Sequence, residues 1–272
     1  MHVIIVQESA NLRDYLDATC PLASFAFARL LRDRDIKVNG KRIAQNITVC
    51  KGDTVVLYFT AKEQSRTFFD ILFEDDAFLV IDKESGVSSE GLFQHLRRGR
   101  ELYFIHRLDR NTSGVILFAK TARARDALLL AFKANKIYKE YHAIVVNSHF
   151  QKEEGVLHAY LKKDSERAKV QIFERATQGA VEICTAYKVL KRYNGYAKLQ
   201  IILHTGRTHQ IRAHLASIGH PIAGDEKYGD REFNQKKHVK RQILVAKRIK
   251  LHLFNFPQMQ DRVFISKYEA EL

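Results

Sequence analysis

The sequence is poor in cysteine and has no long hydrophobic run, and each absence excludes a class of protein. Its three cysteines, Cys20, Cys50 and Cys184, are widely spaced and odd in number, which excludes a disulfide framework and a CxxC metal site. No apolar stretch approaches the roughly 20 residues that a membrane span needs. The N-terminal residues also lack the basic flank and apolar core of a signal peptide. We therefore expect a cytoplasmic protein with no membrane partner.

Motifs for nucleotides and metals are missing as well. The sequence contains neither a Walker A loop nor G-x-G-x-x-G, so no nucleotide cofactor is expected. His209 and His214 are five residues apart, which places them roughly 140° apart around an α-helix and not on one face. Asp75 and Asp76 are candidate magnesium ligands, but an acidic pair at the start of a loop is more typical of a solvated turn. We expect no metal and no cofactor.

The composition is that of a folded, strongly basic protein. The 272 residues are 46% hydrophobic, and 45 Lys and Arg exceed 31 Asp and Glu, giving a formal net charge of +14. This length fits one large domain and one small one. Residues 97–141 and residues 227–250 each carry a net charge of +7, which together equals the whole surplus. Such clustering indicates a surface that binds a polyanion, with a merely solvated surface as the alternative.

The first sixty residues have the pattern of a compact unit. Asn11 is a candidate N-cap for a short helix, and a second helix is expected over 23–32. A strand at 36–38 meets the turn signal Asn39-Gly40, and another strand is expected over 54–59. Two helices and a small sheet with basic hairpin residues fit either an RNA-binding module or a packing domain. The polar, aperiodic residues 61–67 are expected to be a linker.

The rest of the chain has more strands than helices, and the two do not alternate regularly. Strands are expected at 71–73, 78–81, 115–119, 141–146 and 197–203, with helices after Thr121 and over 208–218. This order favours an α+β fold with a mixed, largely antiparallel sheet over a doubly wound α/β fold.

One carboxylate stands out just before a predicted buried strand. Asp109 lies between Arg107 and Arg110 in the segment Ile105-His106-Arg107-Leu108-Asp109-Arg110. A strand entrance is a rigid place for a catalytic group, and the neighbouring guanidinium groups are expected to keep the carboxylate ionised. An ionised carboxylate at a pocket is a competent nucleophile or base. Taken alone, however, Arg-x-Asp-Arg is more often a local ion pair.

Two further segments carry polar groups near predicted element ends. Gly206 turns a strand into a helix, and Arg212 on that helix is able to reach a carboxylate from another strand. Tyr141, in Lys139-Glu140-Tyr141-His142-Ala143, offers a phenol on a strand edge. A core tyrosine and a structural ion pair are the simpler explanations of Tyr141 and Arg212.

Together these segments resemble the RluA-type family of RNA pseudouridine synthases over residues 70–255. The resemblance rests on four motifs in order, namely Glu74-Asp75-Asp76 through Lys83-x-Ser85-Gly86; His106-Arg107-Leu108-Asp109 with Thr112-Ser113-Gly114; Lys139-x-Tyr141-x-Ala143; and Thr205-Gly206-Arg207-Thr208-His209-Gln210-Ile211-Arg212 with Gly219-His220-Pro221-Ile222-x-Gly224-Asp225-x-x-Tyr228-Gly229. The N-terminal residues are similar to the S4-type RNA-binding domain. Within them, Phe25 and Ala26 stand where that domain usually has Ser-Arg.

The resemblance implies an enzyme that isomerises uridine to pseudouridine in structured RNA without a cofactor. It implies that Asp109 is the nucleophile, attacking either the ribose or the uracil ring, and that Arg212 pairs with it. Tyr141 would stack on the target base and could accept a proton from the ribose. Arg107 would help to extrude the base or fill the space that it leaves, and Ile211 would form an apolar wall.

The same resemblance suggests how the chain is divided and what binds RNA. Residues 1–62 would form the S4-like module and residues 68–272 the catalytic domain, in a protein expected to be monomeric. The basic residues expected to bind RNA are Arg32, Lys37, Lys41, Arg42, Arg110 and Arg207.

Three alternatives remain open at the level of sequence. The RNA is expected to be that of the large ribosomal subunit, with transfer RNA as the other candidate. A second class of protein is a non-catalytic ribosomal-RNA binder or chaperone. A third is a metal-dependent nuclease using Asp75, Asp76 and Asp225, although nothing in their spacing favours it.

Overall fold

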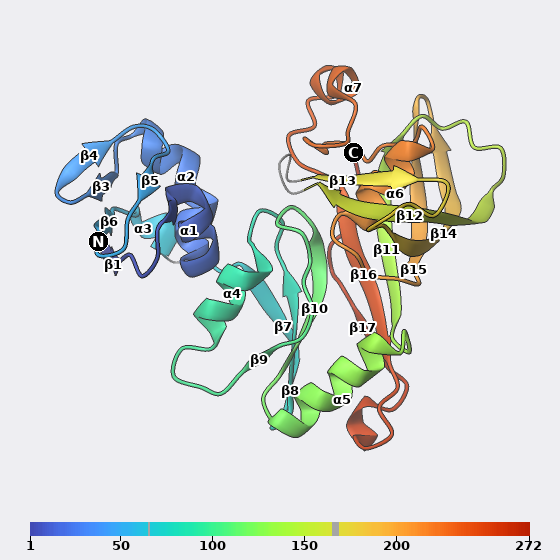
Figure 1. The fold of residues 1–272 in the computed structure, drawn as a ribbon, viewed down its shortest axis with the longest axis horizontal. Coiled ribbons are helices and arrows are strands. Elements are labelled where there is room, and N and C mark those ends of the chain that lie inside the picture. Colours follow the sequence, from blue (N-terminus) through green and yellow to red (C-terminus); the bar gives the residue numbers. More distant parts are fainter. Residues whose placement is uncertain (65, 165–168) are drawn as a thin grey trace.

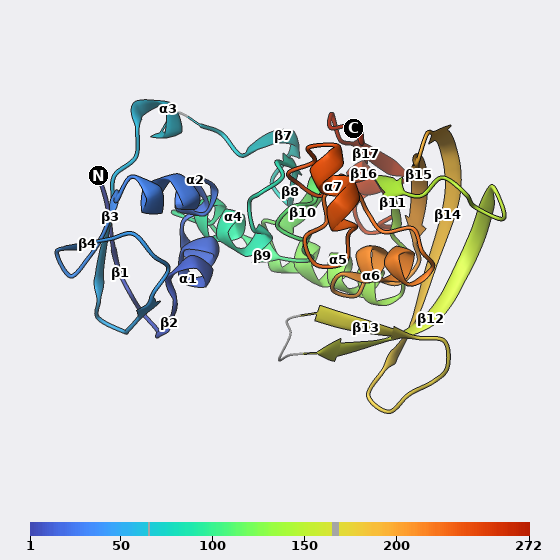
Figure 2. The ribbon, with the colours of Figure 1, turned by 90° about the horizontal axis from the view of Figure 1, so that it is seen from above.

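The computed structural model describes residues 1–64, 66–164 and 169–272. The chain forms two units, each with its own sheet and its own hydrophobic core. Figures 1 and 2 show the smaller, N-terminal unit in blue beside a larger domain built on a long, twisted sheet. The fold is therefore α+β with a mixed, mostly antiparallel sheet, as the sequence predicts. No helix among the described residues has the length and apolar character needed to cross a membrane.

The N-terminal unit packs two helices against a four-stranded antiparallel sheet of order β1-β6-β3-β4. Its elements are β1 (His2–Ile5), β2 (Ala10–Asn11), α1 (Leu12–Thr19), α2 (Pro21–Arg32), β3 (Ile36–Val38), β4 (Lys41–Ile43), β5 (Thr48–Val49), β6 (Thr54–Leu57) and α3 (Ala61–Gln64).

Local chemistry explains most of these boundaries. The side chain of Asn11 accepts the backbone N–H of Arg13 and caps α1 as predicted. Helix α2 begins at Pro21, before the predicted start, because proline fits the first turn, where its missing N–H is not needed. Asn39 and Gly40 both have positive φ, 49° and 80°, the geometry that a tight hairpin between β3 and β4 requires.

The expectation of a free linker over 61–67 is wrong in its first half. Helix α3 is held to the N-terminal unit because the Arg29 guanidinium donates to both carboxylate oxygens of Glu63, each at 2.8 Å. Glu63 also accepts the backbone N–H of Thr60 at 2.9 Å, a capping contact. Residues 61–64 therefore form a helix attached to the small unit.

The large domain has one eleven-stranded sheet of order β13-β12-β14-β15-β11-β16-β10-β8-β7, with β9 paired to β10 and β17 paired to β16. Every pair is antiparallel except β10 with β16. The elements are β7 (Phe69–Glu74), β8 (Phe78–Lys83), α4 (Ser89–Leu96), β9 (Tyr103–Phe104), β10 (Ser113–Ala119), α5 (Ala122–Lys133), β11 (Tyr138–Val146), β12 (Glu154–Asp164), β13 (Lys169–Phe173), β14 (Val181–Tyr193), β15 (Tyr196–Leu203), α6 (Gln210–Ser217), α7 (Arg231–Lys236), β16 (Leu244–Leu251), the 3-10 turn η1 (Pro257–Met259) and β17 (Arg262–Ile265).

The parallel pairing of β10 with β16 fixes the loop that precedes β10. Gly114 lies opposite Ala246, and a Cβ at position 114 would meet the Ala246 carbonyl oxygen at 2.3 Å. Its φ of +116° is also one that side chains disfavour. Only glycine allows this approach, which brings residues 105–112 beside β16 and the neighbouring β11.

The two units are docked through helices α1 and α4. The backbone carbonyl of Asp17 accepts the Ser88 hydroxyl, and the Asp17 carboxylate forms an ion pair with Arg110. Above this contact, the Phe25 ring packs 5.8 Å from the ring of Phe68, between centroids. Arg110, which the sequence analysis expects to bind RNA, lies in this interface and pairs with the Asp17 carboxylate of the other unit.

Gly91 provides a test of the docked arrangement. A Cβ at this position would lie 2.2 Å from the backbone oxygen of Asp17, so we expect Gly91→Ala to force α1 away from α4. The predicted result is a larger radius of gyration in small-angle X-ray scattering and a loss of about 1–3 kcal/mol of stability, as in other overpacked contacts. Gln94→Ala, at an exposed position of the same helix, is the control. An unchanged radius for Gly91→Ala would show that the units do not dock this way.

Candidate active site

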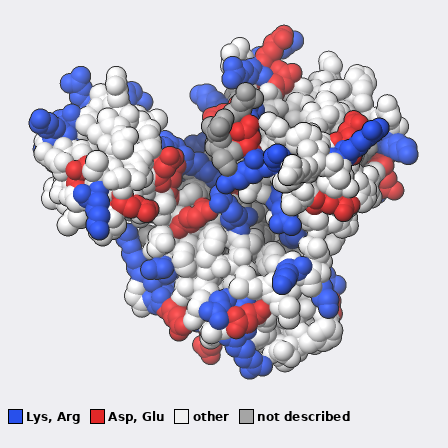
Figure 3. Space-filling model, viewed as in Figure 1, with Lys and Arg blue, Asp and Glu red and all other residues white. Residues whose placement is uncertain are grey.

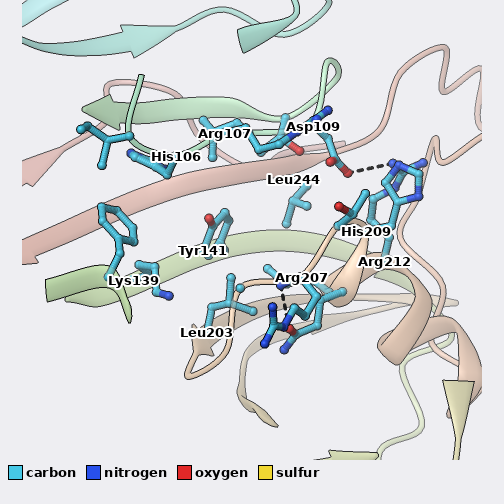
Figure 4. A pocket seen from close by; sticks show the side chains of 18 of the residues that line it. His106, Arg107, Asp109, Lys139, Tyr141, Leu203, Arg207, His209, Arg212 and Leu244 are labelled. Atoms are coloured by element: carbon cyan, nitrogen blue, oxygen red, sulfur yellow. Dashed lines mark hydrogen bonds and ion pairs between the residues drawn. The ribbon is translucent and has the colours of Figure 1, made fainter. Parts of the chain in front are cut away.

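A cavity of about 400 Å³ opens in the large domain where several chain segments meet. Its walls come from the loop 105–112 before β10, from β11, from the loop 203–209 after β15, and from the first turn of α6. Figure 4 shows side chains from these segments converging on the cavity, with Tyr141 near its middle. The structure thus brings together Asp109, Tyr141, Ile211 and Arg212, which are far apart in the sequence.

Arg212, in the wall of this cavity, forms ion pairs with two carboxylates. Its Nη1 donates to Oδ2 of Asp109 at 2.8 Å. Its Nε and Nη2 donate to the two oxygens of Asp225 at 2.6 and 2.9 Å, a bidentate pair. Arg212 is 8% exposed and Asp225 1% exposed, so the guanidinium has little freedom to turn. The side chain of Asp109 keeps an exposed fraction of 17% and faces the cavity.

Asp225 anchors this arrangement, a role that its position in the fourth motif does not predict. Burial alone would raise the pKa of its carboxyl, but the hydrogen bonds and charge of Arg212 hold that pKa below its usual range. The backbone N–H groups of Lys227 and Tyr228 donate to the same carboxylate. Burial likewise opposes the charge on Arg212, yet Asp225 and Asp109 raise its pKa. Arg212 and Asp225 therefore remain charged together.

The start of α6 is shaped so that Arg212 points at Asp109. His209 has a positive φ of 54° and ends the loop immediately before Gln210, which is why the helix begins later than the predicted residue 208. The side chain of Gln210 accepts the backbone N–H of Arg207 at 3.1 Å and donates to the Thr185 hydroxyl at 3.0 Å. Gln210 thus fastens both the loop and the helix to β14.

Tyr141 lies on β11, opposite Ile201 of β15. Burial, together with the nearby Asp109 carboxylate, raises the pKa of its phenol. Tyr141 is therefore a neutral phenol at pH 7, and a phenolate base is disfavoured. Its ring is the feature that it offers to a ligand.

His106 closes one end of the cavity. Its ring stacks on Phe132 with centroids 4.7 Å apart, and its Nε2 accepts the backbone N–H of Leu117 at 3.0 Å. Acceptance at Nε2 requires a neutral ring with its proton on Nδ1. Burial, with a smaller effect of Lys139, lowers the pKa of His106 to about 3.

Lys83 holds the loop of Asp109 from the other side. Its ammonium is fully buried and donates to the backbone carbonyls of Glu84, Val87 and Arg110 at 3.0, 2.8 and 3.2 Å. Burial lowers the pKa of Lys83 to about 7. In the sequence, Lys83 is only one residue of a motif. Its position at the end of an apolar strand is the feature that could have predicted its burial.

The remaining predicted site residues lie around the cavity and on the small unit. Arg107 is exposed at the cavity wall and pairs with Glu90 at 2.7 Å. Ile211 is buried in the wall, and Arg207 is exposed beside it. The other basic residues expected to bind RNA lie on the small unit, at the end of α2 and on the β3–β4 hairpin; these are Arg32, Lys37, Lys41 and Arg42.

The carboxylates of the nuclease alternative have separate roles. Asp75 accepts the backbone N–H groups of Ala77 and Phe78 in the β7–β8 turn, whereas Asp225 is occupied by Arg212. Within the described ranges, no group of three His, Cys, Asp or Glu side chains is placed to hold a metal ion. The described residues therefore offer no three-ligand metal site for the nuclease hypothesis.

Comparison with known proteins finds related sequences and a related solved structure. A sequence profile of RNA pseudouridylate synthases matches residues 77–217. Ribosomal large subunit pseudouridine synthase C from Salmonella typhi is 35% identical over 232 residues, covering 76% of this chain and 72% of the relative. The protein of the same name from Escherichia coli K12 is 34% identical over 235 residues, with the same coverage. The solved structure of human RNA pseudouridylate synthase domain containing 1 has a TM-score of 0.60 at 27% identity, covering 69% of this chain and 80% of that one.

The neutral His106 predicts a dependence of stability on pH. Because its folded pKa of about 3 is below the ordinary 6.5, the unfolded state binds the proton more readily, and stability falls as pH decreases from 6.5 toward 3. This group contributes up to about 1.4 kcal/mol per pH unit in that window. We expect His106→Gln to flatten the plot of unfolding free energy against pH between 6 and 4.5. An identical slope for wild type and variant would contradict the neutral ring; His149→Gln, at an exposed position, is the control.

The anchoring role of Asp225 predicts that a single isosteric substitution at this position lowers stability strongly. Asp225→Asn keeps the shape but removes the charge opposite the buried Arg212, and breaking a buried pair costs about 3–5 kcal/mol. Chemical denaturation measures this loss. Asp126→Asn removes an exposed carboxylate paired with Arg125 and should cost about 0–1 kcal/mol. Equal effects of the two changes would show that Arg212 does not depend on Asp225.

Proposed function

The chain belongs to the RNA pseudouridylate synthase family, and from this we propose that it modifies large-subunit ribosomal RNA with Asp109 as the nucleophile. It is an isomerase that converts uridine to pseudouridine in RNA. In that reaction the bond between ribose C1′ and uracil N1 breaks and a bond between C1′ and C5 forms. The proton on C5 is lost and N1 gains one, so nothing is oxidised or reduced.

The pairing of Asp109 supports its role as nucleophile. Arg212 binds Oδ2 of the carboxylate, and among the described residues no hydrogen bond or ion pair is formed by Oδ1. One oxygen is therefore held and the other is left with its lone pairs available toward the cavity. Attack on ribose C1′ or on the uracil ring would use this same oxygen. The guanidinium also keeps the carboxylate oriented while the base leaves and turns.

The cavity walls suit a base that has left its helix. A flipped base needs a ring to stack on and apolar walls around it. Tyr141 supplies the ring, and Leu203, Ile211 and Leu244 line the same cavity. We assign Tyr141 to stacking, since its raised pKa keeps the phenol neutral. We assign Arg107, at the exposed edge of the cavity, to filling the gap that the base leaves in the RNA.

The charge distribution supports an RNA partner of considerable size. Figure 3 shows Lys and Arg side chains gathered in the hollow between the small unit and the large domain. Contacts between these side chains and RNA phosphates would release counterions, which favours binding. Arg32, Lys37, Lys41 and Arg42 extend the basic surface over the small unit, which we assign to RNA binding as an S4-like module.

The choice of ribosomal over transfer RNA rests on the relatives. The matched proteins from Salmonella typhi and Escherichia coli K12 are both named as synthases of the large ribosomal subunit, and the match covers more than two thirds of each chain. We therefore place the target uridine in large-subunit ribosomal RNA.

The test of this proposal is release of tritium from RNA labelled at uracil C5. Wild-type protein should release tritium from a large-subunit ribosomal RNA transcript, whereas Asp109→Asn should lower the rate by at least about 10³-fold, as loss of a covalent catalyst does. Binding of the same RNA, measured by filter retention, should change by less than about threefold.

Three outcomes separate the alternatives. Tritium release from transfer RNA alone would show that the substrate is transfer RNA and not ribosomal RNA. Equal release by wild type and Asp109→Asn would remove the nucleophile role. RNA binding with no release by either protein would leave a non-catalytic RNA-binding protein. Asp126→Asn, at an exposed position of α5, is the control for handling and folding.

A further inference from the structure

Lys139 is a buried cation that the mechanism above does not use. It lies on β11, is 9% exposed, and lines the cavity. Within the part of the chain that the structure describes, its ammonium has no hydrogen-bond or ion-pair partner. The ring centroid of Phe132 lies 5.8 Å from Nζ, and a Cβ added at Gly206 would lie 3.6 Å from Nζ.

We expect an unpaired ammonium in this position to bind a ligand. Lysine is almost never fully buried unless it is paired, and at 9% exposure Lys139 has little contact with water. Burial lowers the pKa of Lys139, and no carboxylate offsets this effect. His106 cannot serve as its partner, since it is neutral and its Nε2 is occupied by the backbone of Leu117. An acceptor brought by the substrate is the partner that this site lacks.

The position of Lys139 indicates which part of the substrate it meets. Lys139 and Tyr141 are two residues apart on β11, the spacing that places side chains on one face of a strand, and both line the cavity. Figure 4 shows Asp109 and Lys139 toward opposite ends of the cavity, with Tyr141 between them. A base stacked on Tyr141 with its ribose at Asp109 would therefore direct its far edge at Lys139.

We propose, as an extension of the proposed function, that Lys139 Nζ donates a hydrogen bond to the 4-carbonyl oxygen of the target uracil and thereby selects uridine over cytidine. In uracil, C4 lies directly across the ring from N1, the atom bonded to ribose. Cytosine carries an amino group at C4, so a donor would face a donor and the ammonium would be left without its partner. A site built for one acceptor rejects a base that lacks it.

The same contact serves the product. In the isomerisation the free ring turns over so that C5 replaces N1 at the ribose, and the half-turn about the line through N3 and C6 also exchanges C4 with C2. The carbonyl across the ring from the new bond is then that of C2. Lys139 therefore meets a carbonyl oxygen both before and after the rotation, and it forms and breaks no covalent bond. It is a specificity-determining residue of the reaction.

A phosphate is a less suitable partner for Lys139. The phosphates of a flipped nucleotide lie on the ribose side, at the open edge of the cavity. Arg107 and Arg207 are exposed on that edge and meet the backbone there. The base, and not a phosphate, would reach the position of Lys139 beside Phe132 and His106.

The experiment compares binding of two RNAs. The uridine that the wild-type protein modifies is first mapped in large-subunit ribosomal RNA, and two short RNAs are made with uridine or cytidine at that position. Affinities are measured in the Asp109→Asn protein, which binds without turnover, with and without Lys139→Met. We expect Lys139→Met to weaken binding of the uridine RNA about tenfold or more, as for a lost hydrogen bond to a charged group, and to leave the cytidine RNA within about twofold.

Controls decide between a base contact and other roles. Lys139→Arg, which keeps a charged donor, should restore most of the preference for uridine. Lys133→Met, an exposed cavity-edge lysine, should affect both RNAs equally. Equal weakening of both RNAs by Lys139→Met would overturn the inference and assign Lys139 to a phosphate or to structure. Absence of any pseudouridine with wild-type protein would instead overturn the proposed function, on which the inference depends.

Discussion

The architecture of the site depends on one guanidinium held between two carboxylates. Arg212 is fixed by the bidentate contact to the buried Asp225, and its remaining nitrogen holds Asp109. Because the contact to Asp225 is bidentate, the direction of the guanidinium is set before any substrate arrives. Asp109 is thereby presented with one oxygen engaged and the other available. In the proposed mechanism, electrostatic preorganisation of this kind would avoid rearrangement during the reaction.

Much of the surrounding structure offsets the cost of burying these charges. Taking ions from water is expensive, and a buried pair is stable only when its remaining donors and acceptors are satisfied. The backbone N–H groups of Lys227 and Tyr228 complete the shell of Asp225. Lys83 binds the carbonyl of Arg110 and so holds the loop of Asp109 from behind. The docking of the small unit adds a further contact to that loop through Asp17 and Arg110.

The sequence predicted local features well and tertiary partners less well. The cap of α1 by Asn11 and the Asn39-Gly40 turn depend on neighbours in the chain, and both are confirmed. Helix α3 was missed because it is stabilised by Arg29, 34 residues away from Glu63. The ordered motifs indicated that Asp109, Tyr141 and Arg212 act together, and the cavity contains all of them. The motifs give no distances between residues. The pairing of Asp225 with Arg212, the unpaired ammonium of Lys139 and the position of Arg110 between the units could therefore be found only from the three-dimensional structure.

The most direct test of the central claim is chemical rescue of Arg212→Ala by guanidinium ion. If Arg212 acts by holding Asp109, its removal should abolish tritium release from C5-labelled RNA, and millimolar guanidinium should restore part of that rate by occupying the vacated space between the two carboxylates. The same addition should not restore activity to Asp109→Ala. Wild-type rates for Arg212→Ala without guanidinium, or rescue of both variants alike, would contradict the account.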